Sequence, residues 1–249
     1  MMENRIQEAI NINKMNDRGD YTIPTNRLYP YQWNWDNQII YTNGPFLMAD
    51  PGGQFIFLRA SHDLLAMALH LEMDFAAHEI GGWIEQVEAG SDFLWNHVMG
   101  GYCARDLRTG QFSDAITNAS MLSFFSDVGS LEQRKSMEAH CRRILSACAF
   151  GMPSWDPNHH TFESQRCWRG PVWATMNHMV INGLENAQRF DLAARVRNDT
   201  INLINEHGMA EYFDPHSGDG LWGADFSWTE AVHLDLNKAE VAASIAAAE

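Results

Sequence analysis

Apolar residues recur every three or four positions through most of the chain, which is the period of amphipathic helices. Short turn sequences such as Asp50–Gly53 and Gly100–Gly101 separate the periodic segments, with Ser130 as a helix N-cap and Gly208 as a helix C-cap. This pattern predicts about eight helices and few strands, arranged as antiparallel hairpins in an all-α protein. The predicted helices cover residues 4–16, 55–71, 75–95, 115–125, 132–149, 171–186, 192–206 and from 228 into the alanine-rich end.

The segment Cys167–Asn177 gathers aromatic and hydrogen-bonding side chains. Pro171 suits the first turn of a helix, so Trp168 and Arg169 are expected on the preceding loop, with Trp173 and Asn177 on one helix face. An indole ring offers an apolar face to a sugar, and guanidinium or amide groups bind its hydroxyls. Taken alone, the segment fits an ordinary buried helix start at least as well as it fits a sugar site.

A second aromatic segment, Tyr29–Gln38, interleaves indole rings with amides and contains Trp33 and Asp36. Burying so many polar groups is costly unless each one finds a partner, so a binding surface explains the segment better than a plain core. Asp36 has two equal interpretations, as part of that binding surface or as a helix N-cap.

The formal net charge of −15 and pI near 5.0 argue against a nucleic-acid partner, which needs clustered Lys and Arg. No apolar run approaches the roughly 18 residues of a membrane span, and the N-terminus lacks a basic region followed by an apolar core. Four scattered cysteines do not suggest a disulfide framework. The expectation is a cytoplasmic protein that needs no cofactor and no metal, because the eleven histidines show no metal-ligand spacing.

Familiar motifs that occur by chance are set aside. The G-x-G-x-x-G match at 218–223 leaves too little chain for a dinucleotide-binding unit. His78–Gly82 lacks the second histidine of a zinc protease, and Asp214–Asp225 lacks the alternation of a calcium-binding loop.

Five motifs in a fixed order resemble glycoside hydrolase family 63, in particular the glucosylglycerate and mannosylglycerate hydrolases, with trehalase as a more distant relative. They are residues 33–36, 50–71, 168–173, 211–218 and 226–229, and the resemblance extends from 29 to about 236. It implies an (α/α)6 toroid that binds a small α-glucoside or α-mannoside and hydrolyses it with inversion. Two carboxyl groups about 6.5–9.5 Å apart perform that reaction.

The resemblance also implies roles for individual residues. Glu211 matches the general base that activates water. Asp36 matches a ligand for sugar hydroxyls. The pocket walls and floor correspond to Tyr29, Trp33, Trp168, Trp173, Arg169 and Gly170.

The chain departs from the family at two places. Relatives often have tyrosine where this chain has Cys167. The segment that holds the family's general acid is absent, which suggests an internal deletion near residues 37–43 within a single domain of residues 1–249. The toroid is therefore expected to be incomplete, and its open ring predicts self-association or poor stability.

Three functional hypotheses follow. The first is a glycosidase with Glu211 as base and an acid supplied by Asp36, Glu163 or Asp225. The second is a truncated or vestigial relative that binds sugar without efficient turnover. The third, a helical scaffold without a sugar site, explains the tryptophan-rich loops poorly.

Overall fold

The computed structural model describes residues 36–43 and 47–246, and the chain divides into two compact units. The smaller unit comprises residues 1–48 and Asp106–Gln111. Its described helix is α3 (Asn37–Asn43), where the Asp36 carboxylate accepts the Ile39 N–H at 2.9 Å. Asp36 is therefore a helix N-cap, one of its two predicted roles. The helix predicted over 4–16 lies outside the described residues, and the deletion predicted near α3 stays a prediction.

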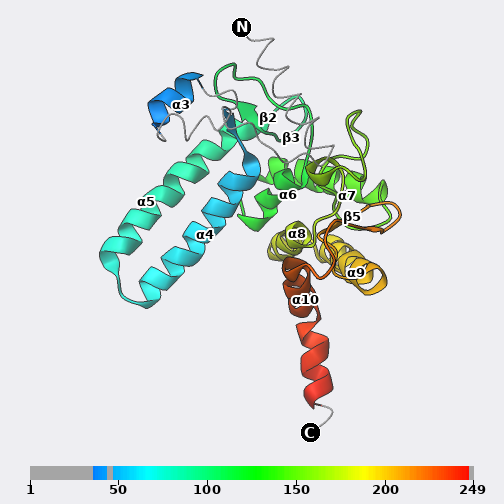
Figure 1. The fold of residues 1–249 in the computed structure, drawn as a ribbon. Helices are drawn as coiled ribbons and strands as arrows, with labels where there is room; N and C mark the ends of the chain where they lie inside the picture. The colour runs from blue at the N-terminus through cyan, green and yellow to red at the C-terminus, as the bar shows by residue number, and fades with distance from the viewer. Residues whose placement is uncertain (1–35, 44–46, 247–249) are drawn as a thin grey trace. The chain divides into compact units, whose positions relative to one another are not determined.

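The larger unit is helical, as the sequence pattern predicts. Figure 1 shows α4 and α5 side by side as a long hairpin, while α6 packs on α4 and α8, and α8 packs on α9 and α10. These helices are α4 (Pro51–His70), α5 (Asp74–Ser91), α6 (Asn118–Phe125), α7 (Leu131–Ser146), α8 (Ala174–Asn186), α9 (Phe190–His207) and α10 (Ser227–Ala246). Among the described residues, no helix is both long and apolar enough to cross a membrane.

The remaining elements are short. Strand β2 pairs antiparallel with β3, and β5 pairs antiparallel with β6. The strands are β1 (Met48–Ala49), β2 (Trp95–Asn96), β3 (Gly101–Tyr102), β4 (Arg105–Asp106), β5 (Tyr212–Phe213) and β6 (Gly220–Leu221), and the 3-10 turns are η2 (Asp92–Leu94) and η3 (Cys167–Arg169).

The helix ends follow the capping chemistry of the sequence. Ser130 and Gln133 form a reciprocal capping box at the start of α7, which confirms the predicted N-cap. Gly208 ends α9 with φ of 82°, a backbone conformation that glycine adopts easily. Asp50 accepts the Gly53 N–H at 2.8 Å and so caps α4, whose first residue is Pro51.

Several predicted helix boundaries were wrong. The helix predicted from residue 55 begins at Pro51, and the helix predicted to reach residue 149 ends at Ser146. The helix predicted from Pro171 begins at Ala174, because Val172 forms backbone hydrogen bonds with Phe213 instead of continuing a helix. The helix predicted to reach Trp95 ends at Ser91, because Trp95 pairs with Tyr102. The helix predicted from residue 115 begins at Asn118, after the capping residue Thr117.

A glycine allows a close contact between two helices of the core. Gly183 on α8 faces the backbone of α6, and a Cβ at this position would lie 2.7 Å from the carbonyl carbon of Phe124. Any side chain here would push α8 away from α6, so the absence of Cβ determines how closely the two helices pack.

The substitution Gly183→Ala should therefore lower the free energy of unfolding by about 1–3 kcal/mol, because backbone atoms cannot move aside easily. Chemical denaturation would measure the change. Gly82→Ala on α5 is the matched control, since a Cβ there meets nothing within 4 Å and should stabilise the helix by up to about 1 kcal/mol. Equal effects of the two substitutions would contradict the close α6–α8 contact.

Candidate active site

Backbone hydrogen bonds bring the two principal sequence motifs together. Val172 and Phe213 exchange N–H···O bonds of 2.8 and 2.9 Å, and Val172 also bridges to Pro153. Phe213 in turn pairs with Gly220 on β6. Four short segments from two separate parts of the sequence, around 153–172 and 213–220, are thus joined side by side.

The two tryptophans of the central motif form a stack in this region. The Trp168 and Trp173 rings are parallel, with centroids 4.0 Å apart, and the contact continues to Tyr212, whose ring centroid is 4.7 Å from that of Trp173. Trp173 is only 4% exposed, whereas Trp168 is 51% exposed. Trp173 is therefore the buried support of the stack, and Trp168 offers an indole surface to solvent.

Arg169 and Gly170 hold the same loop closed. Gly170 lies so close to the Glu163 carbonyl that no Cβ would fit, and its N–H donates to the Ser154 hydroxyl at 3.0 Å. The Arg169 guanidinium forms an ion pair with Glu163, which also pairs with Arg166 at 3.3 Å. The buried Arg169 Nε has no hydrogen-bond partner within the described part of the chain, so one donor is left for another group.

Glu211 lies beside this loop. Its backbone N–H donates to the Trp222 carbonyl at 3.0 Å, and its side chain is half-buried rather than sealed in an apolar interior. Burial and the negative charge of Glu211 both raise the pKa of the Cys167 thiol. The residue after Glu211, Tyr212, contacts Trp173, which places Glu211 next to the stacked tryptophans along the chain.

Three of the six described non-glycine residues with positive φ angles belong to the Cys167 loop and to the segment after Glu211. Cys167, Trp222 and Asp225 all have positive φ angles, of 28°, 52° and 59°. Such conformations are costly for residues with a side chain and occur preferentially at functional sites. Sequence reasoning missed Trp222 and Tyr212, although Tyr212 directly follows Glu211 and Trp222 belongs to the rejected G-x-G-x-x-G match.

Asp214 fixes the segment that follows Glu211. Its buried carboxylate accepts the N–H groups of His216 and Ser217 and the hydroxyl of Ser164 at 2.8 Å. Burial acts to raise its pKa, but these hydrogen bonds outweigh burial and lower it. Asp214 therefore remains ionised and ties this turn to the Ser164 loop.

The structure corrects one predicted position and leaves two untested. Asn177 was expected on the face of Trp173 that meets the ligand, but it is fully buried and bonds to Met152 N–H and Thr200 Oγ1. It anchors the start of the Gly151 loop to α8 and α9. Tyr29 and Trp33 lie outside the described residues.

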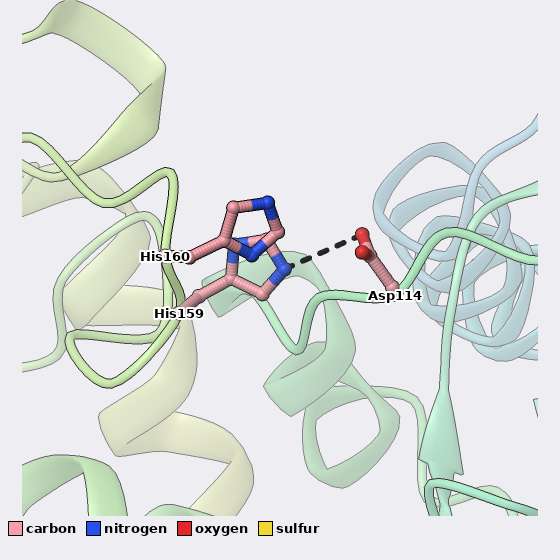
Figure 2. Close-up of side chains that lie close together, drawn as sticks. All are labelled: Asp114, His159 and His160. Atoms are coloured by element: carbon pink, nitrogen blue, oxygen red, sulfur yellow. Dashed lines mark ion pairs between the residues drawn. The ribbon is translucent and has the colours of Figure 1, made fainter.

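Potential metal ligands occur together in one place in the described part of the chain. Figure 2 shows Asp114 and the adjacent residues His159 and His160 with their side chains converging, and the ligand atoms all lie within 4.8 Å of one another. Neither histidine belongs to the predicted site residues.

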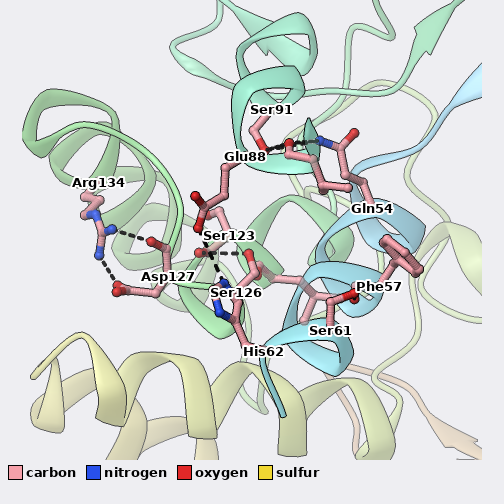
Figure 3. A network of polar contacts seen from close by, with 12 residues as sticks. Gln54, Phe57, Ser61, His62, Glu88, Ser91, Ser123, Ser126, Asp127 and Arg134 are labelled. Atoms are coloured by element: carbon pink, nitrogen blue, oxygen red, sulfur yellow. Dashed lines mark hydrogen bonds and ion pairs between the residues drawn. The ribbon is translucent and has the colours of Figure 1, made fainter. Parts of the chain in front are cut away.

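A polar cavity of about 320 Å³ lies between α5, β3 and the start of α7. Figure 3 shows Glu88, Asp127 and Arg134 of its wall within a larger network that also includes His62, which is 3.4 Å from Glu88. The buried Tyr102 hydroxyl on the wall has no partner among the described residues, and burial raises its pKa to about 12. None of the predicted site residues lines this cavity.

A helical body with loops that hold stacked indole rings beside a half-buried carboxylate is typical of a carbohydrate-active protein. The chain belongs to the family of mannosylglycerate hydrolase MGH1-like glycoside hydrolase domains, whose family model matches residues 4–229.

Individual relatives agree with this family. Mannosylglycerate hydrolase MGH1 of Selaginella moellendorffii is 36% identical over 201 residues, which are 81% of this chain and 41% of the relative. A mannosylglycerate hydrolase of Thermus thermophilus is 33% identical over 233 residues, 93% of this chain and 56% of the relative. The chain thus spans about half the length of the curated relatives it matches.

Solved structures confirm the predicted fold class. The crystal structure of a GH63 mannosylglycerate hydrolase from Thermus thermophilus in complex with glucose has a TM-score of 0.78 and 34% identity, over 84% of this chain and 49% of the other. The neutral trehalase Nth1 from Saccharomyces cerevisiae, at 12% identity and a TM-score of 0.59, is similar in fold alone. The chain is therefore all-α with the trehalase-like (α/α)6 toroid class of fold, of which it spans a part.

The Glu211–Cys167 proximity predicts a change in thiol reactivity. Replacing Glu211 by Gln removes the negative charge that raises the Cys167 pKa, so the thiolate fraction at pH 8 should increase. Iodoacetamide should then alkylate Cys167 up to about tenfold faster. Mass spectrometry would locate the label, because the three buried thiols, Cys103, Cys141 and Cys148, have pKa values raised to about 12.

Glu206→Gln is the matched control, since it removes an exposed carboxylate of α9 and should leave the alkylation rate unchanged. The same rate at Cys167 in wild type and Glu211→Gln would show that the two side chains do not interact.

Proposed function

We propose that this chain is a glycoside hydrolase that acts on a small α-glucoside or α-mannoside, such as glucosylglycerate or mannosylglycerate, with inversion at the anomeric carbon. The relatives are named for hydrolysis of these compounds, and the proposal transfers that chemistry to the present site. Glu211 would be the base that removes a proton from water as the water attacks.

The observation that best supports the proposal is the position of Glu211 beside the loop of the stacked tryptophans. A half-buried carboxylate can reach water while partial exclusion of solvent strengthens its interactions. Trp168, 51% exposed, would contact the apolar face of a sugar, with Trp173 behind it. Arg169 and Gly170 would form the pocket floor. The sugar-binding roles of Tyr29, Trp33 and Asp36, which belong to the smaller unit, stay expectations from the sequence.

The general acid is the least defined group. Glu163 already forms ion pairs with Arg166 and Arg169, which engage the ionised carboxylate, whereas a general acid must be protonated. Asp36 caps α3 in the smaller unit. Asp225 is exposed and has no hydrogen bond or ion pair within the described residues, so of the three candidates it is the one free to act.

The alternative function is sugar binding without efficient turnover. The support for it is that the chain spans about half the length of its curated relatives. We also expect from the sequence that the segment of the general acid is absent. We further expect a cytoplasmic location, with which the four free thiols agree, and no nucleic-acid partner, given the net charge of −15.

The two functions are separated by assaying the purified chain with mannosylglycerate and glucosylglycerate and following the product anomer by NMR. If the chain is a hydrolase, the first product should have inverted configuration, and Glu211→Gln should lower kcat by about 10²–10⁴-fold. Asp225→Asn should have a comparable effect if Asp225 is the acid.

Glu206→Gln again serves as control and should retain wild-type turnover. Sugar binding by calorimetry without turnover would establish the alternative. Turnover unchanged by Glu211→Gln would remove Glu211 from the mechanism, and absence of both binding and turnover would refute both functions.

Self-association is a further expectation, now with a defined surface. The turn between α4 and α5 exposes large apolar side chains on both helices, and Phe75 is 83% exposed. A second copy of this chain is a suitable occupant, because the same hairpin on two copies can cover itself about a two-fold axis. The other exposed apolar residues of this surface are Met67, Leu69, Leu71 and Met73.

Light scattering after size-exclusion chromatography should therefore show a dimer that Phe75→Glu converts to monomer. Val98→Glu is the control. Val98 is 96% exposed in the turn between β2 and β3, away from the α4–α5 turn in the sequence, so its substitution should not change the molar mass of the oligomer. A monomer at all concentrations would contradict self-association.

A further inference from the structure

Asp114, His159 and His160 bring two imidazoles and a carboxylate together from segments far apart in the sequence. His159 Nε2 lies 3.3 Å from the Asp114 carboxylate oxygen (Figure 2). The two histidine rings follow one another along the chain, with centroids 4.4 Å apart. Asp114 is exposed, and His159 is largely covered, with 11% of its side chain accessible.

The His159 ring is held by its other nitrogen. Nδ1 lies 3.2 Å from both the Trp155 indole N–H and the Thr161 backbone N–H, and 2.8 Å from the Thr161 hydroxyl. These contacts fix the ring so that Nε2 points toward Asp114. In metal-ligating histidines the second ring nitrogen is also held, but there it donates its N–H, so this ring is oriented in its metal-free tautomer.

We propose that Asp114, His159 and His160 form a binding site for a divalent transition metal ion of the zinc type, with water completing the coordination. Two imidazoles and one carboxylate are a donor set that zinc accepts, with an open position for water. Ligand atoms bound tetrahedrally at about 2.0–2.1 Å from zinc lie about 3.3–3.5 Å apart. The 3.3 Å separation of His159 Nε2 and the Asp114 oxygen already matches this value.

Metal binding requires a change of tautomer at His159. Without metal, Nδ1 accepts the two N–H donors, so Nε2 holds the proton and donates it to Asp114. To bind metal, Nε2 must present its lone pair, and the ring proton must move to Nδ1. The Thr161 hydroxyl oxygen can then accept Nδ1–H. The Trp155 indole N–H and the Thr161 backbone N–H must both give up their bonds to Nδ1.

The site would fasten one part of the loop that holds Trp168. Residues 155–161 precede Glu163, whose N–H donates to the Arg169 carbonyl at 3.1 Å. Asp114 lies on a separate segment that leads into α6. A metal ion bound by both segments would cross-link them, so its binding should stabilise the folded chain independently of any activity.

The sequence-based expectation of no metal site depended on ligand spacing along the chain. Adjacent histidines and an aspartate on a remote segment do not match the ligand spacings by which zinc sites are recognised. Only the folded structure shows that their ligand atoms converge.

The test is zinc titration of the full chain by calorimetry, after treatment with a chelator. Wild type should bind one zinc ion per chain. His160→Ala and Asp114→Asn should each raise the Kd for zinc at least about tenfold. His97→Ala is the matched control, because His97 is an exposed histidine outside the cluster. Zinc should also raise the melting temperature of wild type and His97→Ala more than that of His160→Ala.

Two spectroscopic measurements address the geometry. Cu²⁺ bound at the site should show two imidazole nitrogens in its electron paramagnetic resonance spectrum, and one in His160→Ala. The indole N–H resonance of Trp155, assigned with Trp155→Phe, should shift when zinc binds, because that N–H loses its acceptor.

Absence of zinc binding would overturn the proposal. Equal affinity of wild type, His160→Ala and Asp114→Asn would also overturn it, since the ion would then be bound elsewhere. Zinc affinity, melting temperature and the two spectra do not depend on sugar hydrolysis. Failure of the metal site and failure of the proposed enzyme function are therefore separate results.

Discussion

The exchange of two backbone hydrogen bonds between Val172 and Phe213 is the contact on which the site depends. It pairs the segment that ends in Trp173 with the segment that begins at Glu211, and it places both beside Pro153 and β6. Because an extended segment directs successive side chains to opposite faces, this pairing determines which residues meet. Without it, the stacked tryptophans and Glu211 would belong to separate loops.

The helices support this pairing through buried polar contacts. Asn177 on α8 accepts the Met152 N–H and donates to Thr200 on α9, and Asp199 accepts the Gly151 N–H at 2.8 Å. Removing one partner would leave a buried polar group unsatisfied, which costs about 1–3 kcal/mol. The loop that begins at Gly151 is therefore fixed to two helices before it reaches the tryptophans.

Helical periodicity predicted the body of the fold, but local chemistry alone did not predict the site. Pro171 is compatible with a helix start. The next residue, Val172, instead pairs with the remote residue Phe213, so the helix begins only at Ala174. The sequence alone does not distinguish the roles of Trp168 and Trp173. In the structure Trp173 is buried and supports the ring of Trp168, which is exposed, and this difference arises only from tertiary packing. Asn177 shows the same limit, because helix spacing predicts a shared face and not what that face contacts.

Rigidity of the Gly151–Gly170 loop relates the fold to the proposed chemistry. The buried Asp156 carboxylate binds Arg143 at 2.9 and 2.6 Å, and although burial acts to raise its pKa, these bonds lower it. Glu163 and Arg169 close the far end of the loop. A loop held at its start, middle and end would lose little further conformational entropy on binding the proposed sugar ligand. The candidate site is thus organised by the protein's own contacts, as the proposed catalysis by positioned groups would require.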